Sequence, residues 1–171
     1  MPELLDQLAS VARADAYWIE QIQECTAPRP CRKSIHLAVF VEPFLSLLMC
    51  GQKTIESRFS ANGCAPFEQI WPGDLVLLKR AGGEIVGIGR VRDARHLRRP
   101  IGGWDELRLA YQHQIGAPDN AFWSDVSAAS YATLIWFDHI DPIAPLECDK
   151  RDRRGWVVVK RASEQLPLQF A

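Results

Sequence analysis

Two glycines, Gly87 and Gly89, interrupt a stretch at 84–93 that otherwise has the composition of a β-strand. Glycine inside a strand marks a sharp bend of the sheet or a point where another group approaches the backbone closely. Apolar runs with the composition of further strands occur at 35–41, 75–79, 133–140 and 156–159. Together the runs and the glycines predict a closed, curved sheet, a small β-barrel.

Helical patterns surround the expected strands. Apolar side chains recur at helical spacing over 3–24, which predicts one or two amphipathic helices. Shorter helices are expected after Pro43, at 104–115 and at 118–131, and a glycine follows each of the first two where it can end the helix. The sequence therefore predicts an α+β fold, a small β-barrel flanked by helices with an N-terminal helical extension.

The stretch at 26–34 contains two prolines and three basic residues without apolar periodicity, which is typical of a linker. It predicts a division of the chain into an N-terminal helical extension and linker at 1–33 and a β-barrel domain at 34–171. The N-terminal helices are expected either to pack on the barrel or to form a homodimer.

The composition is that of a globular protein, with 47% hydrophobic and 24% charged residues among 171. The longest apolar runs are far shorter than the ~20 residues that cross a bilayer, and residues 1–24 lack the apolar region of a signal peptide. We therefore expect a cytoplasmic protein without membrane contact. The five cysteines form no CxxC pair and no zinc-finger spacing with histidine. We expect free, mostly buried thiols, no metal and no organic cofactor.

The middle of the chain is basic although the formal net charge is −1. Residues 79–99 contain seven lysines and arginines against two acidic residues. Such segregation can be an electrostatic footprint for phosphates, to which Arg90 and Arg92 would contribute. The alternative is that these arginines are solvated side chains on the outer face of a strand.

The segment GQKTIESR at 51–58 places three charged residues directly after an apolar stretch. In a strand over 55–60, Glu56, Arg58 and Ser60 share one face, and Lys53 projects from the preceding turn at the edge of that face. A carboxylate there can accept hydrogen bonds from an amino-bearing base edge, while the cations offer donors to phosphates. The structural alternative is an ion pair that joins strand to helix, worth only ~0–1 kcal/mol if exposed.

Three elements of the sequence resemble the ASCH domain family of the PUA-like superfamily. They are the motif Gly51-x-Lys53-x-x-Glu56-x-Arg58, the sequence Pro-Gly-Asp at 72–74 before a strand, and the sequence Gly-Trp-Val-Val-Val at 155–159. The resemblance covers roughly residues 35–160. It implies a small β-barrel with a cleft lined by the motif residues, and a role in binding RNA or another nucleotide-like ligand. The expected ligand-binding residues are Gly51, Lys53, Thr54, Glu56, Arg58, Trp71, Arg90, Arg92 and Arg154.

The resemblance also implies an enzymatic alternative, because related folds include hydrolases that deacetylate acetylated cytidine and a ribonuclease. In that amidohydrolase pattern a threonine three residues after the motif lysine resembles the nucleophile, but this position is Glu56 here. Thr54 is adjacent to Lys53 and would project differently. If the protein is a metal-independent enzyme, Lys53 and Glu56 are the expected catalytic residues.

Other aromatic and ionisable residues have simpler expected roles. His36 lies in a core strand and is expected to have a satisfied hydrogen bond, whereas His96 is expected to be a solvated surface group. Most tryptophans are expected in the core, with Trp71 the candidate for stacking on a base at the mouth of the cleft. Arg154 is either part of a solvated loop or a phosphate contact beside the cleft.

Overall fold

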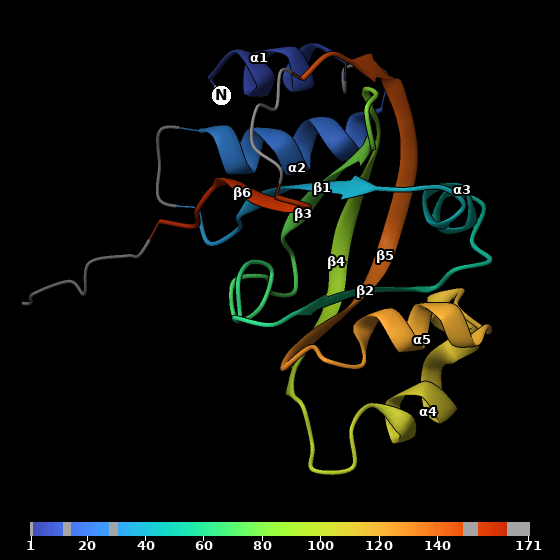
Figure 1. Cartoon of the computed structure of the whole chain (residues 1–171). Helices are drawn as coiled ribbons and strands as arrows, with labels where there is room; N and C mark the ends of the chain where they lie inside the picture. The colour runs from blue at the N-terminus through green and yellow to red at the C-terminus, as the bar shows by residue number, and fades with distance from the viewer. Residues whose placement is uncertain (1, 12–14, 28–30, 149–153, 164–171) are drawn as a thin grey trace, which may run out of the picture.

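The computed structural model describes residues 2–11, 15–27, 31–148 and 154–163 (Figure 1). These residues form five helices and six strands. In chain order they are α1 (Pro2–Val11), α2 (Ala16–Thr26), β1 (Ile35–Phe40), α3 (Phe44–Met49), β2 (Ile55–Ser60), β3 (Leu75–Arg80), β4 (Ile85–Arg98), α4 (Asp105–Ile115), α5 (Asn120–Val126), β5 (Tyr131–Leu146) and β6 (Trp156–Lys160).

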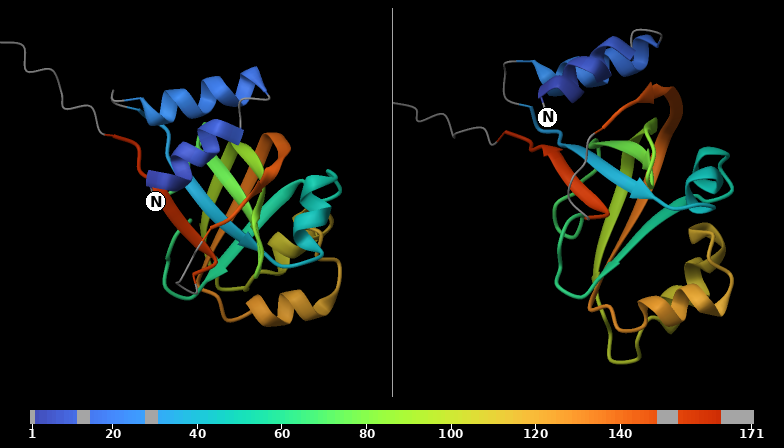
Figure 2. Two further views of the ribbon diagram at one scale, coloured as in Figure 1. Left: turned by 90° about the horizontal axis from the view of Figure 1, so that it is seen from above. Right: turned by 45° about the horizontal axis from the view of Figure 1, so that its top comes forward.

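The six strands form one curled sheet in the order β2-β5-β4-β3-β1-β6. β1 and β3 are parallel, and the other neighbouring pairs are antiparallel. Figure 2 shows α1 and α2 over one end of the sheet and α4 and α5 at the other. The fold is α+β, as expected. The sheet is a half-barrel rather than a closed barrel, because its two edge strands, β2 and β6, do not pair with each other. The side chain of Arg58, described below, bridges the space between them.

The glycines of β4 are explained by close approach of two side chains. A Cβ atom on Gly87 would lie 2.9 Å from Met49 Sδ, and one on Gly89 would lie 2.8 Å from Phe137 Cδ1. β4 is also longer than expected and pairs with β5 along most of its length. The basic stretch at 90–98 is therefore part of the sheet and not a loop.

We expect Gly89→Ala to destabilise the protein by about 1–3 kcal/mol, the usual cost of forcing an extra methyl group into a packed site. The added methyl must displace the ring of Phe137 or shift β5. Gly102→Ala is the matched control, because a Cβ there meets nothing within 4 Å. Denaturant unfolding of both variants measures the difference, and equal stabilities would contradict the close packing.

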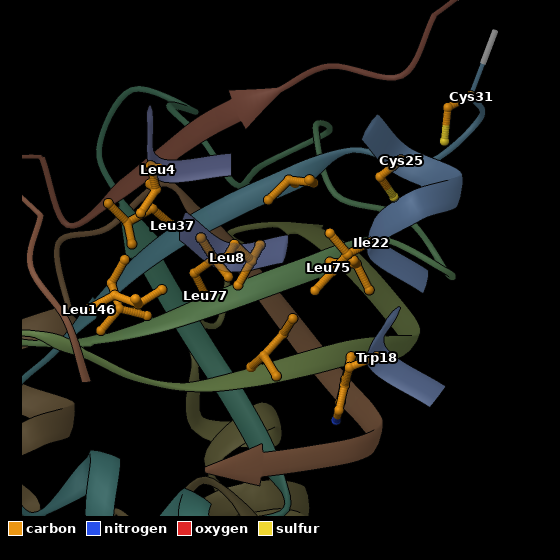
Figure 3. Packing of buried hydrophobic residues seen from close by; sticks show 13 residues of the cluster. Leu4, Leu8, Trp18, Ile22, Cys25, Cys31, Leu37, Leu75, Leu77 and Leu146 are labelled. Atoms are coloured by element: carbon orange, nitrogen blue, oxygen red, sulfur yellow. The ribbon is translucent and has the colours of Figure 1, made fainter. Parts of the chain in front are cut away.

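The N-terminal segment forms two helices that pack on the sheet (Figure 3). Leu8 of α1 and Ile22 of α2 are buried in the same cluster as Leu37 and Leu77 of the strands. The indole nitrogen of Trp18 also donates a hydrogen bond to the side chain of Asp141, at 2.8 Å. Of the two expected arrangements, packing on the barrel is observed. The division of the chain at residue 33 and the homodimer stay predictions.

Two further buried clusters complete the core. One fills the inside of the half-barrel and includes Ile135 and Trp156; the other joins α4 and α5 to β2 and includes Trp104 and Trp123. α4 ends as predicted at Gly116, whose φ of 76° is left-handed. α5 is shorter than the helix predicted at 118–131, because residues from 131 onward pair with β4 as strand β5.

None of the helices in the described ranges is long and apolar enough to cross a membrane. The five cysteines are free, as predicted. The prediction that most of them are buried is wrong. Cys25 and Cys31 are buried, but Cys50 and Cys64 are exposed, because they lie in or next to turns, and Cys148 is intermediate.

Candidate functional site

The turn between α3 and β2 fixes the start of the motif. Gly51 has a φ of +77°, a left-handed conformation that favours glycine. The backbone N–H of Lys53 then donates to the Leu47 carbonyl at 2.9 Å, and that of Thr54 donates to the Gln114 carbonyl at 2.9 Å. The turn is therefore fastened to α3 on one side and to the end of α4 on the other. This directs the Lys53 side chain inward.

Lys53 is a buried cation, with only 2% of its side chain exposed. Its Nζ donates a hydrogen bond to the Ile115 carbonyl at 2.6 Å and lies 3.3 Å from Glu56 Oε2. Burial lowers the pKa of Lys53 below its ordinary value, and the nearby carboxylate of Glu56 partly opposes this shift. The amine is thus closer to losing its proton than a surface lysine would be.

Glu56 lies between two cations. Its Oε1 is 2.6 Å from Arg58 Nε, its Oε2 contacts Lys53, and its side chain is 4% exposed. The carboxylate is therefore held in a fixed position by two buried contacts. Such a network is costly to break, because removal of one partner leaves an uncompensated buried charge.

Arg58 bridges the open seam of the half-barrel. Its Nη2 donates to the Val39 carbonyl of β1 at 2.9 Å, and its Nη1 donates to the Gly155 carbonyl next to β6 at 3.3 Å. The guanidinium also lies 4.9 Å from the centre of the Phe40 ring and 5.2 Å from that of Trp156. Hydrogen bonds in the plane and aromatic rings close by make this a site for arginine rather than lysine.

A cavity of about 350 Å³, the motif cavity, opens beside these three side chains. Its lining combines the charged motif residues with the aromatic rings of Phe40, Phe44 and Phe122. Lys53, Glu56 and Arg58 together carry one net positive charge when the lysine is protonated. A flat, polar ring system with an attached anionic group matches such a lining in shape and charge.

Two other predicted motif residues face a different opening. Gly51 and Thr54 line an adjacent cavity of about 240 Å³, which also contains part of Lys53. Thr54 is exposed, and it lines this second cavity but not the motif cavity. The structure therefore brings Lys53, Glu56 and Arg58 together and places Thr54 apart from them.

Trp71 and the strand arginines lie away from the motif cavity. Trp71 is 53% exposed and packs against His96 with ring centres 5.0 Å apart. Arg90 donates a hydrogen bond to the Tyr17 hydroxyl at 3.1 Å and so ties β4 to α2, while Arg92 is exposed on the same strand. The ligand-binding roles predicted for these three residues stay predictions.

Arg154 lines a third opening, a cavity of about 450 Å³ that we call the Arg154 cavity. The basic residues that directly precede it in sequence, Lys150, Arg151 and Arg153, lie outside the described residues. Within the described part of the chain, no group of three or more His, Cys, Asp or Glu side chains is arranged to hold a metal ion. The expected absence of a metal or cofactor stays a prediction.

The two histidines discussed above differ from each other. His36 is buried, contacts Asp74 through Nε2 at 3.1 Å and accepts the indole N–H of Trp156 at Nδ1, which confirms the prediction of a satisfied side chain. The prediction for His96 is wrong. It accepts the Glu68 N–H and contacts the Ile70 carbonyl, both at 3.1 Å, because the loop at 68–70 folds back over β4.

Sequence reasoning missed the aromatic walls of the motif cavity. Phe44 directly follows Pro43 and begins α3, only a few residues before the motif. This position in the sequence could have indicated that Phe44 lines the cavity. Phe122 comes from α5, which is far away in sequence, and no local pattern indicates its position. For Phe40, the apolar run at 35–41 predicts only a place in a buried strand.

The six-stranded half-barrel with its flanking helices is an ASCH-like fold. No family model matches the chain, and no curated protein matches it. The crystal structure of an ASCH protein from Zymomonas mobilis is similar, with a TM-score of 0.54 and 14% sequence identity over 68% of this chain and 75% of that chain. Two single-residue variants of that protein match with TM-scores of 0.52 at 15% identity, covering 68% and 69% of this chain and 78% and 76% of theirs. At these identities the similarity concerns the fold alone.

Proposed function

We propose that the protein binds RNA or a nucleotide-like ligand in the motif cavity, through Lys53, Glu56 and Arg58. The observation that carries the proposal is the buried charged network on the wall of a cavity that three aromatic residues also line. Buried ionisable groups in a cavity are expensive for stability, and their concentration at one place is typical of a functional site. The ASCH-like fold supports the proposal by analogy only.

The chemistry of the cavity fits a nucleobase. Each oxygen of Glu56 contacts one cation and has a remaining lone pair that can accept from an exocyclic amino group. The rings of Phe44 and Phe122 can stack on the face of the base, and Lys53 and Arg58 can donate to a carbonyl or phosphate. Cytosine, adenine and guanine, which carry exocyclic amino groups, are expected to bind better than uracil.

We expect log K for single-stranded RNA to fall linearly with the logarithm of the salt concentration. The slope should be about −0.7 for each contacted phosphate. Fluorescence anisotropy with labelled oligonucleotides at several salt concentrations measures this slope. Binding of the four nucleoside monophosphates, followed by calorimetry, tests the base preference separately. The absence of any nucleotide or RNA binding at low salt would overturn the proposed function.

A second candidate function, a metal-independent hydrolase acting on RNA or acetylated cytidine, is favoured by the environment of Lys53. Burial lowers the pKa of its amine, and a lysine with a lowered pKa can exchange a proton with a reacting group near neutral pH more readily than an ordinary lysine. Glu56 Oε2, at 3.3 Å, can share that proton. Thr54 does not line the motif cavity, so the geometry supports proton transfer by Lys53 rather than attack by Thr54.

If Lys53 acts as a base, we expect turnover to rise with pH until the lowered pKa of Lys53 is passed, because the neutral amine is the active form. Glu56→Gln removes the main influence that raises this pKa, so the rise should move to lower pH. Acetate release and RNA cleavage are measured with EDTA present, with Lys53→Ala as the inactive control. A pH profile that is identical in wild type and Glu56→Gln would contradict this role.

A further inference from the structure

Two of the five cysteines lie next to each other where the N-terminal helices pack on the sheet. Cys25 is in the last turn of α2, and Cys31 lies in the segment that leads into β1. Both are buried, with 0% and 3% of their surface exposed, in the cluster that α1 and α2 form with the strands. Their thiols hydrogen-bond to each other, and Figure 3 shows the two side chains together at the end of α2. The fold thus brings two thiols from different elements into contact.

The residues that follow β6 hold both cysteines in place. The backbone N–H of Cys31 donates to Ser163 Oγ at 3.1 Å, and the Ser163 N–H donates back to the Cys31 carbonyl at 2.8 Å. Lys160 Nζ, at the end of β6, donates to the Cys25 carbonyl. Contacts with a third segment therefore fix the positions of the two cysteines relative to each other.

The surroundings of the two thiols differ. Burial raises the pKa of the Cys25 thiol to about 12, and the adjacent Cys31 adds to the rise. Cys25 therefore keeps its proton at neutral pH. Cys31 Sγ accepts the backbone N–H of Lys33 at 3.4 Å and lies 3.6 Å from the Lys33 carbonyl. The N–H donor would stabilise negative charge on the Cys31 sulfur once its proton is lost.

We propose that Cys25 and Cys31 are a redox-active thiol pair, which a small hydroperoxide oxidises to a reversible intramolecular disulfide. A single buried thiol is an inert core residue, but two thiols in contact can complete a reaction that neither completes alone. Within the described part of the chain they belong to no group of three metal-ligating side chains, so disulfide chemistry fits the pair better than zinc. Neither cysteine lines the motif cavity, and nothing about the pair depends on the proposed function.

The oxidation balances with hydrogen peroxide as the oxidant. The Cys31 sulfur attacks one peroxide oxygen and the O–O bond breaks, which gives a sulfenic acid on Cys31 and a first water. The Cys25 sulfur then attacks the sulfenic sulfur, and the hydroxyl group leaves with the Cys25 proton as a second water. The thiols lose the electron pair that the peroxide gains. The product links the end of α2 covalently to the segment before β1.

The test uses the full chain with Cys50, Cys64 and Cys148 each replaced by serine, so that the pair provides the only thiols. After brief treatment with hydrogen peroxide the intact mass should fall by about 2 Da, the mass of the two hydrogen atoms lost, and dithiothreitol should restore it. Peptide mapping identifies the linked residues. Addition of Cys31→Ser to the same chain is the control, in which no loss of 2 Da is expected for lack of a second thiol.

The same oxidation is followed in native buffer and in denaturant. Because the native fold holds the thiols in contact, the native chain should form the disulfide at least as fast as the unfolded chain. The disulfide should also raise Tm by about 4–8 °C, because it restricts the unfolded chain. Loss of mass in the unfolded chain alone, or oxidation of Cys31 that stops at the sulfenic acid, would show a purely structural pair and overturn the inference. A lower Tm after oxidation would overturn it as well, because the native positions would then not fit the bond.

Discussion

Glu56→Gln should lower the free energy of unfolding by about 3–5 kcal/mol, the usual effect of breaking a buried charge pair. Glutamine keeps the shape of glutamate, but it leaves the buried amine of Lys53 and the guanidinium of Arg58 without a balancing charge. Ligand affinity should also fall, by about 1–3 kcal/mol, if the carboxylate accepts hydrogen bonds from a base. Unfolding by denaturant and nucleotide binding on the same sample measure the two effects.

The controls separate the two roles of Glu56. Glu68→Gln, in an exposed pair with Arg98 at 3.7 Å, should change stability by less than about 1 kcal/mol. The double variant Lys53→Met/Glu56→Gln removes both charges and should be more stable than the sum of the single effects predicts. Destabilisation with unchanged nucleotide binding would assign Glu56 to the scaffold and contradict its place in the binding site.

The sequence predicts the local elements of the site better than their assembly. The strand after Gly51 and the meeting of Lys53, Glu56 and Arg58 follow from the alternation of a strand and from one turn. Those features depend on residues that are close together in sequence, so the local sequence is enough to predict them. The same is true of the Pro-Gly turn before β3, where Gly73 has a φ of +93°.

What the sequence could not predict depends on contacts between distant segments. Phe122 reaches the motif cavity only because α5 packs on β2. Arg90 donates a hydrogen bond to Tyr17 of α2, a helix of the N-terminal segment. The exposed stretch of arginines in β4 therefore does not meet the motif. The distribution of charge along a sequence does not show which charged side chains lie on the same surface. That depends on the order of the strands in the sheet.

Arg58→Lys should destabilise the protein by about 2–4 kcal/mol although it keeps the charge, because lysine loses the forked hydrogen bonds and most of the contact with two rings. Arg58 joins β2 to the Val39 carbonyl of β1 and to Gly155, so the substitution should loosen the seam rather than the centre of the sheet. Arg95→Lys is the matched control. Arg95 also lies over a ring, 5.0 Å from the centre of Trp136, but its side chain is 55% exposed.

Amide hydrogen exchange measures which strands the Arg58→Lys substitution destabilises. Amides of β6 and of the turn at Gly155 should exchange faster in Arg58→Lys than in the wild type, whereas amides of β3, in the middle of the sheet, should be unaffected. Exchange that is faster throughout the sheet would mean that Arg58 stabilises the whole domain and not the seam. Because the Arg58 side chain also lines the motif cavity, a loosened seam should weaken nucleotide binding as well.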